Sequence, residues 1–247
     1  MRSLSMLVFA IALCMPGCHD SSAGFVGGSP GGVVHGNGNV VEEFRDVSGA
    51  RSVNLQGVGQ LYIRQGARAE LRIRAEENLL EYLGSDVRGG ELLIWKEAPT
   101  LINSQPIEYH LTVVDLERVV LSGAGPIQGL DLNTGALTLL LTGVGNVEFV
   151  NLNAPALVVD TSGVGRLTLS GTVQTQTLRL AGLGDYNGRD LDSADAEVLI
   201  ANTSSATVRA RDTLRATIHG SGSVYYIGNP VVYTSNSGSG SVVRIGG

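Results

Sequence analysis

A Gly-x-Gly element recurs along the chain at nearly constant spacing, and it restricts the possible folds more than any other feature. Seven copies follow short apolar runs, and their first glycines are Gly57, Gly123, Gly143, Gly163, Gly182, Gly220 and Gly238. From Gly123 onward, successive first glycines are about 20 residues apart, except that Gly182 and Gly220 are about twice as far apart. Residues 202–206 therefore occupy the place of one missing copy. The longer interval from Gly57 to Gly123 would hold three units, so this counting predicts about nine units of about 20 residues.

Alternation of apolar and polar residues runs through each copy, which is typical of β-strands with one buried face. Leu139, Leu141, Val147 and Phe149 have the parity of the glycines between them. A second apolar position precedes each run, at Leu132, Leu152, Val173 and Leu191. A unit this short, without a helical pattern, cannot enclose a core alone, whereas stacked coils shield one another at a spacing of about 4.8 Å. The predicted fold is therefore an all-β solenoid, a parallel β-helix of about nine rungs.

The glycines allow two interpretations. They either prevent Cβ contacts between closely stacked corners or form a cradle for a phosphate group. A phosphate cradle requires a following helix N-terminus, which the pattern does not provide, so we favour the structural interpretation.

The N-terminal residues are typical of an export signal. Arg2 precedes an apolar run from residue 4 to residue 13, which is too short to span a bilayer. The run leads to Gly17 and Cys18, which resemble a bacterial lipobox with Cys18 as the lipidated residue. We therefore expect a lipoprotein signal peptide at 1–17, a flexible Gly/Ser-rich tether at 18–39 and one β-helical domain at 40–247. His19 after the cysteine favours outer-membrane sorting; the alternative is an ordinary secretory signal in which Cys18 has no role.

The charge balance argues against nucleic acid as a partner. The formal net charge is −6, and Lys96 is the only lysine. Binding of a phosphate backbone requires a basic patch. Cys14 and Cys18 are the only cysteines, so the predicted mature domain needs no disulfide bond.

Several segments together resemble the head GIN domain family of putative auto-transporter adhesins. They are residues 41–47, 53–59, 75–80, 91–94, 107–113, 220–230 and 237–242. The resemblance covers about residues 38–247. It implies a right-handed parallel β-helix on an exported bacterial protein. The family offers no established catalytic residues to transfer, and several copies here carry Val or Leu between the glycines where Ser is common.

The residues between the paired glycines are the candidate contact site. If alternation continues through each copy, they point outward and form an apolar stripe along the solenoid, and such patches mark interfaces. The alternative is a kink at the glycines that turns these side chains into the core. The apolar stripe would consist of Val58, Ala124, Val144, Val164 and Leu183.

Acidic and histidine side chains are the candidates for catalytic or metal-binding groups. Asp185, Asp190, Asp192 and Asp195 lie close together in sequence, as do Glu76 and Glu77. They would serve a polysaccharide-active enzyme or a weak Ca²⁺ site, but turn formation explains the aspartates more simply. His35, His110 and His219 show neither a catalytic-triad nor a metal-ligand spacing. We expect no catalytic residue, cofactor or metal.

Three function classes follow from these observations. The preferred one is a non-catalytic envelope lipoprotein, exported to the outer membrane and facing periplasm or cell surface, that contacts a glycan or protein partner. The second is an enzyme acting on polysaccharide. The third is a structural or oligomerising envelope module, which would bury the stripe or an open end in a homo-oligomer.

Overall fold

The computed structural model describes residues 32–97 and 100–246. Within these residues the chain forms nineteen strands and one short 3-10 helix, η1 (Glu77–Tyr82). The first nine strands are β1 (Val33–His35), β2 (Val40–Asp46), β3 (Ser52–Leu55), β4 (Gln60–Gln65), β5 (Glu70–Glu76), β6 (Leu83–Arg88), β7 (Glu91–Lys96), β8 (Thr100–Ile102) and β9 (Glu108–Val113). The others are β10 (Arg118–Leu121), β11 (Ile127–Leu130), β12 (Leu137–Leu141), β13 (Val147–Thr161), β14 (Leu167–Leu180), β15 (Tyr186–Ile200), β16 (Ala206–Ile218), β17 (Val224–Ile227), β18 (Val231–Asn236) and β19 (Val242–Gly246).

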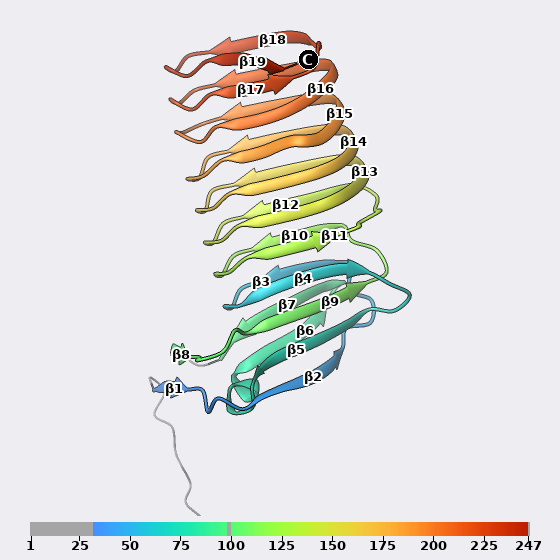
Figure 1. Ribbon diagram of the computed structural model, residues 1–247, viewed down its shortest axis with the longest axis vertical. Helices are drawn as coiled ribbons and strands as arrows, with labels where there is room; N and C mark the ends of the chain where they lie inside the picture. Colours follow the sequence, from blue (N-terminus) through green and yellow to red (C-terminus); the bar gives the residue numbers. More distant parts are fainter. Residues whose placement is uncertain (1–31, 98–99, 247) are drawn as a thin grey trace, which may run out of the picture.

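Coils stacked in parallel form the body of the molecule, as predicted (Figure 1). One inward column runs through Leu139, Val159, Leu178, Val198 and Ala216, which are paired in register from strand to strand. All five side chains are buried. The strand content is 65%. The alternating pattern thus places every second side chain inside, at paired positions on successive coils, and the parallel β-solenoid is confirmed.

The base of the solenoid departs from this regular stacking. Strands β7 and β9 lie in parallel beneath β3 and β4 and form one more rung. Strand β5 instead pairs antiparallel with both β2 and β9, and β6 pairs antiparallel with β7. Together with η1, these strands close the lower end of the column (Figure 1). The 3-10 helix is an element that the alternating pattern did not predict.

The prediction that the interval from Gly57 to Gly123 holds three units is wrong. Gly57 and Gly123 lie on neighbouring coils: β10 pairs directly with β3, and the Gly123 N–H donates to the Leu55 carbonyl at 2.8 Å. The segment between these two glycines is therefore not three coils. It builds the antiparallel base, since distance along the chain does not determine which strands pair.

The interior is largely aliphatic, and the upper coils contain a buried polar cluster. Tyr186 donates its hydroxyl proton to Gln176 at 3.0 Å, and Gln176 donates to the Ser193 hydroxyl at 2.8 Å. Ser193 in turn donates to the Arg209 carbonyl at 2.7 Å. These three buried side chains satisfy one another, which avoids the cost of an unpaired polar group in the core.

The N-terminal predictions fall largely outside the described residues. The signal peptide at 1–17 and Cys18 lie there, as does the tether up to residue 31. The last part of the predicted tether is structured, however. Strand β1 pairs in parallel with β8, and the N–H groups of Asn37 and Gly38 donate to Asn78 and Glu76. The ordered structure thus begins before the predicted boundary at residue 40, because residues distant in sequence supply hydrogen-bond partners.

Candidate functional site

The corner formed by the Gly-x-Gly copies is held by close backbone stacking. A Cβ atom at Gly123 would lie 2.0 Å from the Gly57 carbonyl oxygen, and one at Gly143 would lie 2.0 Å from the Gly123 oxygen. Gly125 also has a φ of 138°, which side-chain-bearing residues rarely adopt. The first glycine of a pair is therefore needed for space and the second also for conformation, as the structural interpretation predicted.

The residue between the glycines is paired with its equivalent on the neighbouring coil. Isolated parallel bridges connect Val58 to Ala124, Ala124 to Val144, Val144 to Val164, and Val164 to Leu183. On the central rung, the Val144 N–H donates to Gly123 and the Val144 carbonyl accepts from Gly125, both at 2.9 Å. These bonds fix the direction of each side chain and place all five in one column.

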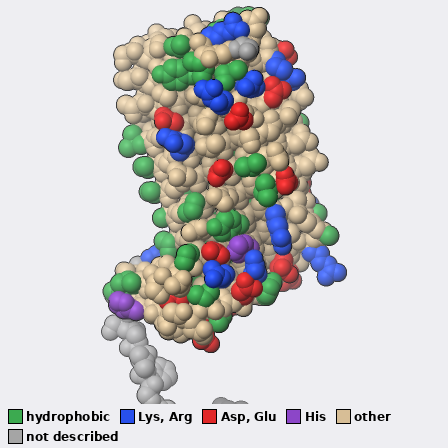
Figure 2. Space-filling view, in the orientation of Figure 1, with side chains coloured by type: hydrophobic (Ala, Val, Ile, Leu, Met, Phe, Trp, Pro, Cys, Tyr) green, Lys and Arg blue, Asp and Glu red, His purple; other side chains and the backbone are tan. Residues whose placement is uncertain are grey.

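The apolar stripe points outward. Val144, Val164 and Leu183 are 57%, 46% and 58% exposed, and Ala124 is exposed as well. Val58, on the lowest coil of the stripe, is half-buried against the core. Figure 2 shows hydrophobic side chains in a row along the left edge, where Figure 1 places the turns between β10 and β11 and between β12 and β13. The alternative of an inward kink is wrong for the exposed members; their role in contact stays a prediction.

The stripe has a polar continuation toward the C-terminus. Thr203, Ser221 and Ser239 take the same outward place on the next three coils, and all are exposed. The Ser221 N–H donates to Asn202 and the Ser239 N–H donates to Gly220, which repeats the bonding of the apolar copies. One corner therefore presents apolar side chains on its lower coils and hydroxyl groups on its upper coils.

A second surface feature, which sequence reasoning missed, is a groove of about 420 Å³ on the outer face of the sheet. We call it the side groove. It is lined by Tyr62, Ile63, Arg64, Arg72, His110, Leu111, Gln128, Gly129, Leu130, Glu148 and Val150. These residues come from β4, β5, β9, β11 and β13, which are neighbours in the sheet. Figure 2 shows hydrophobic, basic and acidic side chains mixed on this face around one histidine.

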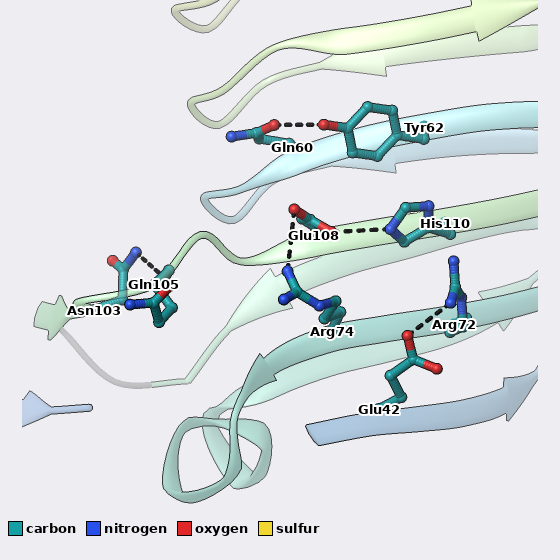
Figure 3. A network of polar contacts seen from close by, with 9 residues as sticks. All are labelled: Glu42, Gln60, Tyr62, Arg72, Arg74, Asn103, Gln105, Glu108 and His110. Carbon is teal, nitrogen blue, oxygen red and sulfur yellow. Dashed lines mark hydrogen bonds and ion pairs between the residues drawn. The ribbon is translucent and has the colours of Figure 1, made fainter. Parts of the chain in front are cut away.

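Strand register explains the shape of the side groove. One rim is an outward column in which Glu148, Gln128, Tyr62, His110 and Arg72 are successive partners. Figure 3 shows Tyr62, His110 and Arg72 one below another on β4, β9 and β5. The opposite rim lies two residues further along the strands, and Val150, Leu130 and Arg64 are its successive partners. The inward-pointing residues between the rims leave their backbone as the floor.

Hydrogen bonds and ion pairs hold the first rim. The Tyr62 hydroxyl donates to Gln60 at 2.7 Å, and the His110 Nε2 lies 3.1 Å from Glu108 (Figure 3). The Tyr62 and His110 rings are stacked with centroids 4.9 Å apart. Arg72 pairs with Glu42 at 2.7 Å. Each of these side chains is therefore oriented by a neighbour on the same face.

The acidic residues considered as catalytic groups do not converge. Asp190, Asp192 and Asp195 lie along β15, where they pair in register with Ser170, Thr172 and Thr175. Asp185 accepts the Ser205 N–H at 3.1 Å, and Asp192 lies 3.5 Å from Arg211. These are turn and surface contacts.

Glu76 has a different environment, because its side chain is fully buried at the base. It accepts the Gly38 N–H at 2.6 Å, the Ser104 N–H at 2.9 Å and the Ser104 hydroxyl at 2.7 Å. The Ser104 hydroxyl, with the backbone N–H groups, lowers the pKa of Glu76 despite burial. Glu76 therefore connects two loops as a structural clamp. Its neighbour Glu77 is exposed and accepts from Asn39.

The three histidines within the described residues occupy separate places. His110 belongs to the side groove, His219 contacts Ser237 at 2.9 Å, and His35 lies on β1. Across residues 32–97 and 100–246, no three His, Cys, Asp or Glu side chains gather as a metal site would require. None of the helices in this part of the chain has the length and apolar character to span a membrane.

The chain is similar to a known protein family. Residues 51–230 match the sequence profile of the family described as "Putative auto-transporter adhesin, head GIN domain". No curated protein matches the chain.

Three solved structures share its fold. A putative adhesin from Bacteroides fragilis has a TM-score of 0.78 and 23% identity, covering 86% of this chain and 100% of its own. A putative adhesin from Parabacteroides distasonis has a TM-score of 0.68 and 20% identity, covering 87% and 100%. A putative lipid binding protein from the same organism has a TM-score of 0.66 and 22% identity, covering 87% of this chain and 100% of its own.

Proposed function

Because the chain belongs to the head GIN domain family of putative auto-transporter adhesins, we propose that it is a non-catalytic, adhesin-like binding protein of the bacterial cell envelope. The observation that carries this proposal is the exposed apolar stripe on a corner held by backbone hydrogen bonds. Val144, Val164 and Leu183 expose about half of their surface, although the same corner tolerates Ser at equivalent positions. Exposed contiguous apolar side chains favour contact with another macromolecule.

The stripe is suited to a protein partner. Its side chains carry no hydrogen-bonding group, and the backbone groups beside them are already paired within the corner. Burial of these side chains against an apolar patch would contribute roughly 25 cal/mol per Å² of apolar surface removed from water. A glycan, which is rich in hydroxyl groups, would find no partner there.

Adhesion of beads coated with the full chain to bacterial cells tests the role of the stripe. The double variant Val144→Ser, Val164→Ser imitates the outward Ser221 and Ser239 of the same chain, so the fold should be preserved. We expect it to lose most of the adhesion. The control Val231→Ser changes an equally exposed valine, 59% accessible, on β18. Equal adhesion by both variants, or none by the unaltered chain, would contradict the proposal.

Membrane attachment through Cys18 is the second part of the proposal. Cys18 would carry the lipid and hold the domain at the outer membrane, facing the periplasm or the exterior. In fractionated cells we expect Cys18→Ala to move the chain from the membrane to the soluble fraction. Cys14→Ala should leave it in the membrane fraction. Membrane retention of the Cys18→Ala variant would contradict lipidation at this residue.

A further inference from the structure

The side groove combines two chemically different rims. Leu130 and Val150 are exposed apolar side chains on one rim, at 54% and 38%. Tyr62, Gln128 and Glu148 face them from the other rim, where the Gln128 amide lies 3.5 Å from the Glu148 carboxylate. Neighbouring strands place these groups about 4.8 Å apart along the groove. The groove thus offers apolar contact on one side and donors and acceptors in a regular row on the other.

The polar rim is preorganised. Gln60 orients the Tyr62 hydroxyl, Glu108 orients the His110 ring, and Glu42 holds Arg72 (Figure 3). Glu108 is also within 3.4 Å of Arg74, which fixes its carboxylate. Groups that are already oriented lose little conformational entropy when a ligand binds.

Arg64 provides a cation that the protein leaves available. Its Nε donates to the Thr112 hydroxyl at 3.1 Å, which aligns the side chain across β9. No ion pair involves Arg64 among residues 32–97 and 100–246, in contrast to Arg72 and Arg74. The remaining guanidinium N–H groups form a planar fork that matches a carboxylate in bidentate geometry.

We propose that the side groove binds a carboxylated saccharide, with the carboxylate on Arg64. The C–H faces of a sugar ring would pack on Leu130, Val150 and the Tyr62 ring. The sugar hydroxyls would exchange hydrogen bonds with Gln128, Glu148 and His110. The volume of about 420 Å³ lies within the range of about 300–1,000 Å³ typical of small-ligand sites.

The alternation of polar groups favours a sugar over a fatty acid, which also carries a carboxylate. An acyl chain would have to lie against Gln128 and Glu148 and would leave their polar atoms without water or a partner, which is costly. This inference concerns a surface separate from the apolar stripe, so it holds whether or not the stripe binds a protein.

Calorimetric titration of the full chain with matched probes tests the inference. The probes are a galacturonic acid trimer, the corresponding neutral galactose trimer, and palmitate. We expect the acidic trimer to bind at least ten times more tightly than the neutral one, and palmitate not to compete. Arg64→Gln should remove this preference, and Tyr62→Ala should weaken both sugars.

Arg118→Gln is the matched control, because Arg118 is an exposed arginine on β10 outside the groove. It should bind like the unaltered chain, and thermal unfolding should show that all three variants are folded. Equal binding of acidic and neutral trimers, an unchanged preference in Arg64→Gln, no sugar binding, or displacement of the sugar by palmitate would overturn the inference.

Discussion

A Cβ atom at Gly143 would lie 2.0 Å from the carbonyl oxygen of Gly123, and that oxygen already accepts the Val144 N–H. The oxygen cannot move without breaking the ladder between two coils. The same relation recurs where Gly163 faces Gly143 and where Gly182 faces Gly163. At the scale of the residue, the carbonyl oxygen of one coil therefore leaves room only for glycine at Gly143, Gly163 and Gly182.

Alanine substitution of two glycines checks this account. Gly143→Ala should lower the free energy of unfolding by about 1–3 kcal/mol through overpacking. Gly135→Ala should have little effect, because no atom lies within 4 Å of a Cβ built there. Thermal unfolding of both variants measures the difference. Equal melting temperatures would show that the corner can relax.

At the scale of the element, each strand of the solenoid contributes alternately to the core and to the surface. Strand β13 buries Val147 and Phe149, while Glu148 and Val150 line the side groove. Strands β4 and β11 likewise bury Leu61 and Ile127 and present their outward side chains to the side groove. The inward side chains of a single strand therefore support the fold, and its outward side chains form the candidate binding surface.

Substitution of two leucines compares how much an inward and an outward position contribute to the free energy of unfolding. Leu167 on β14 is 2% exposed, whereas Leu183 in the stripe is 58% exposed. Leu167→Ala should cost about 2–5 kcal/mol of stability by leaving a cavity between coils. Leu183→Ala should change stability by less than about 0.5 kcal/mol. Urea unfolding followed by circular dichroism checks both values; a comparable loss at Leu183 would mean that the stripe supports the fold.

At the scale of the whole molecule, the two parts of the solenoid are built differently. The strands of the upper coils pair in parallel, whereas the base combines parallel and antiparallel pairs. Glu76 joins the segment around Gly38 to the loop at Ser104 and Gln105. Gly36 lies so close that a Cβ there would be 2.1 Å from the Glu76 carboxylate. One buried carboxylate thus holds three distant parts of the chain together.

Acid should weaken this clamp. The pKa of Glu76 lies below its ordinary value of 4.5 because Ser104 and backbone N–H groups favour the charged form. A lowered pKa means that Glu76 contributes stability above about pH 4.5, and that this contribution is lost as the pH falls through the folded-state pKa. Glu76→Gln should melt at a lower temperature than the unaltered chain at pH 7, and the gap should narrow as the pH falls below 4.5.

Glu197→Gln provides the control, because Glu197 is exposed on β15. Its melting temperature should equal that of the unaltered chain at every pH. Calorimetry across the acidic pH range measures the melting temperatures of the unaltered chain and both variants. A gap between Glu76→Gln and the unaltered chain that does not change with pH would show that the charge of Glu76 is not what holds the base.

The local pattern along the chain was sufficient to predict the stacked coils, the inward residues such as Leu139 and Val159, and the corner column that contains Val144. Each depends on alternation within a strand and on the regular recurrence of the paired glycines, both of which are visible without knowing any partner strand. The direction of the stripe depended on whether the glycines kink the chain. Backbone pairing between coils decided it.

Only the tertiary structure revealed the base, the clamp and the side groove. Between Gly57 and Gly123 the chain reverses direction, so counting residues overestimated the number of coils in this segment. Glu76 meets Ser104 across 28 residues, and Tyr62 meets His110 through the pairing of β4 with β9. Contacts of this kind arise from which strands become neighbours. Neighbours are selected by burial of the whole core rather than by any local run of residues.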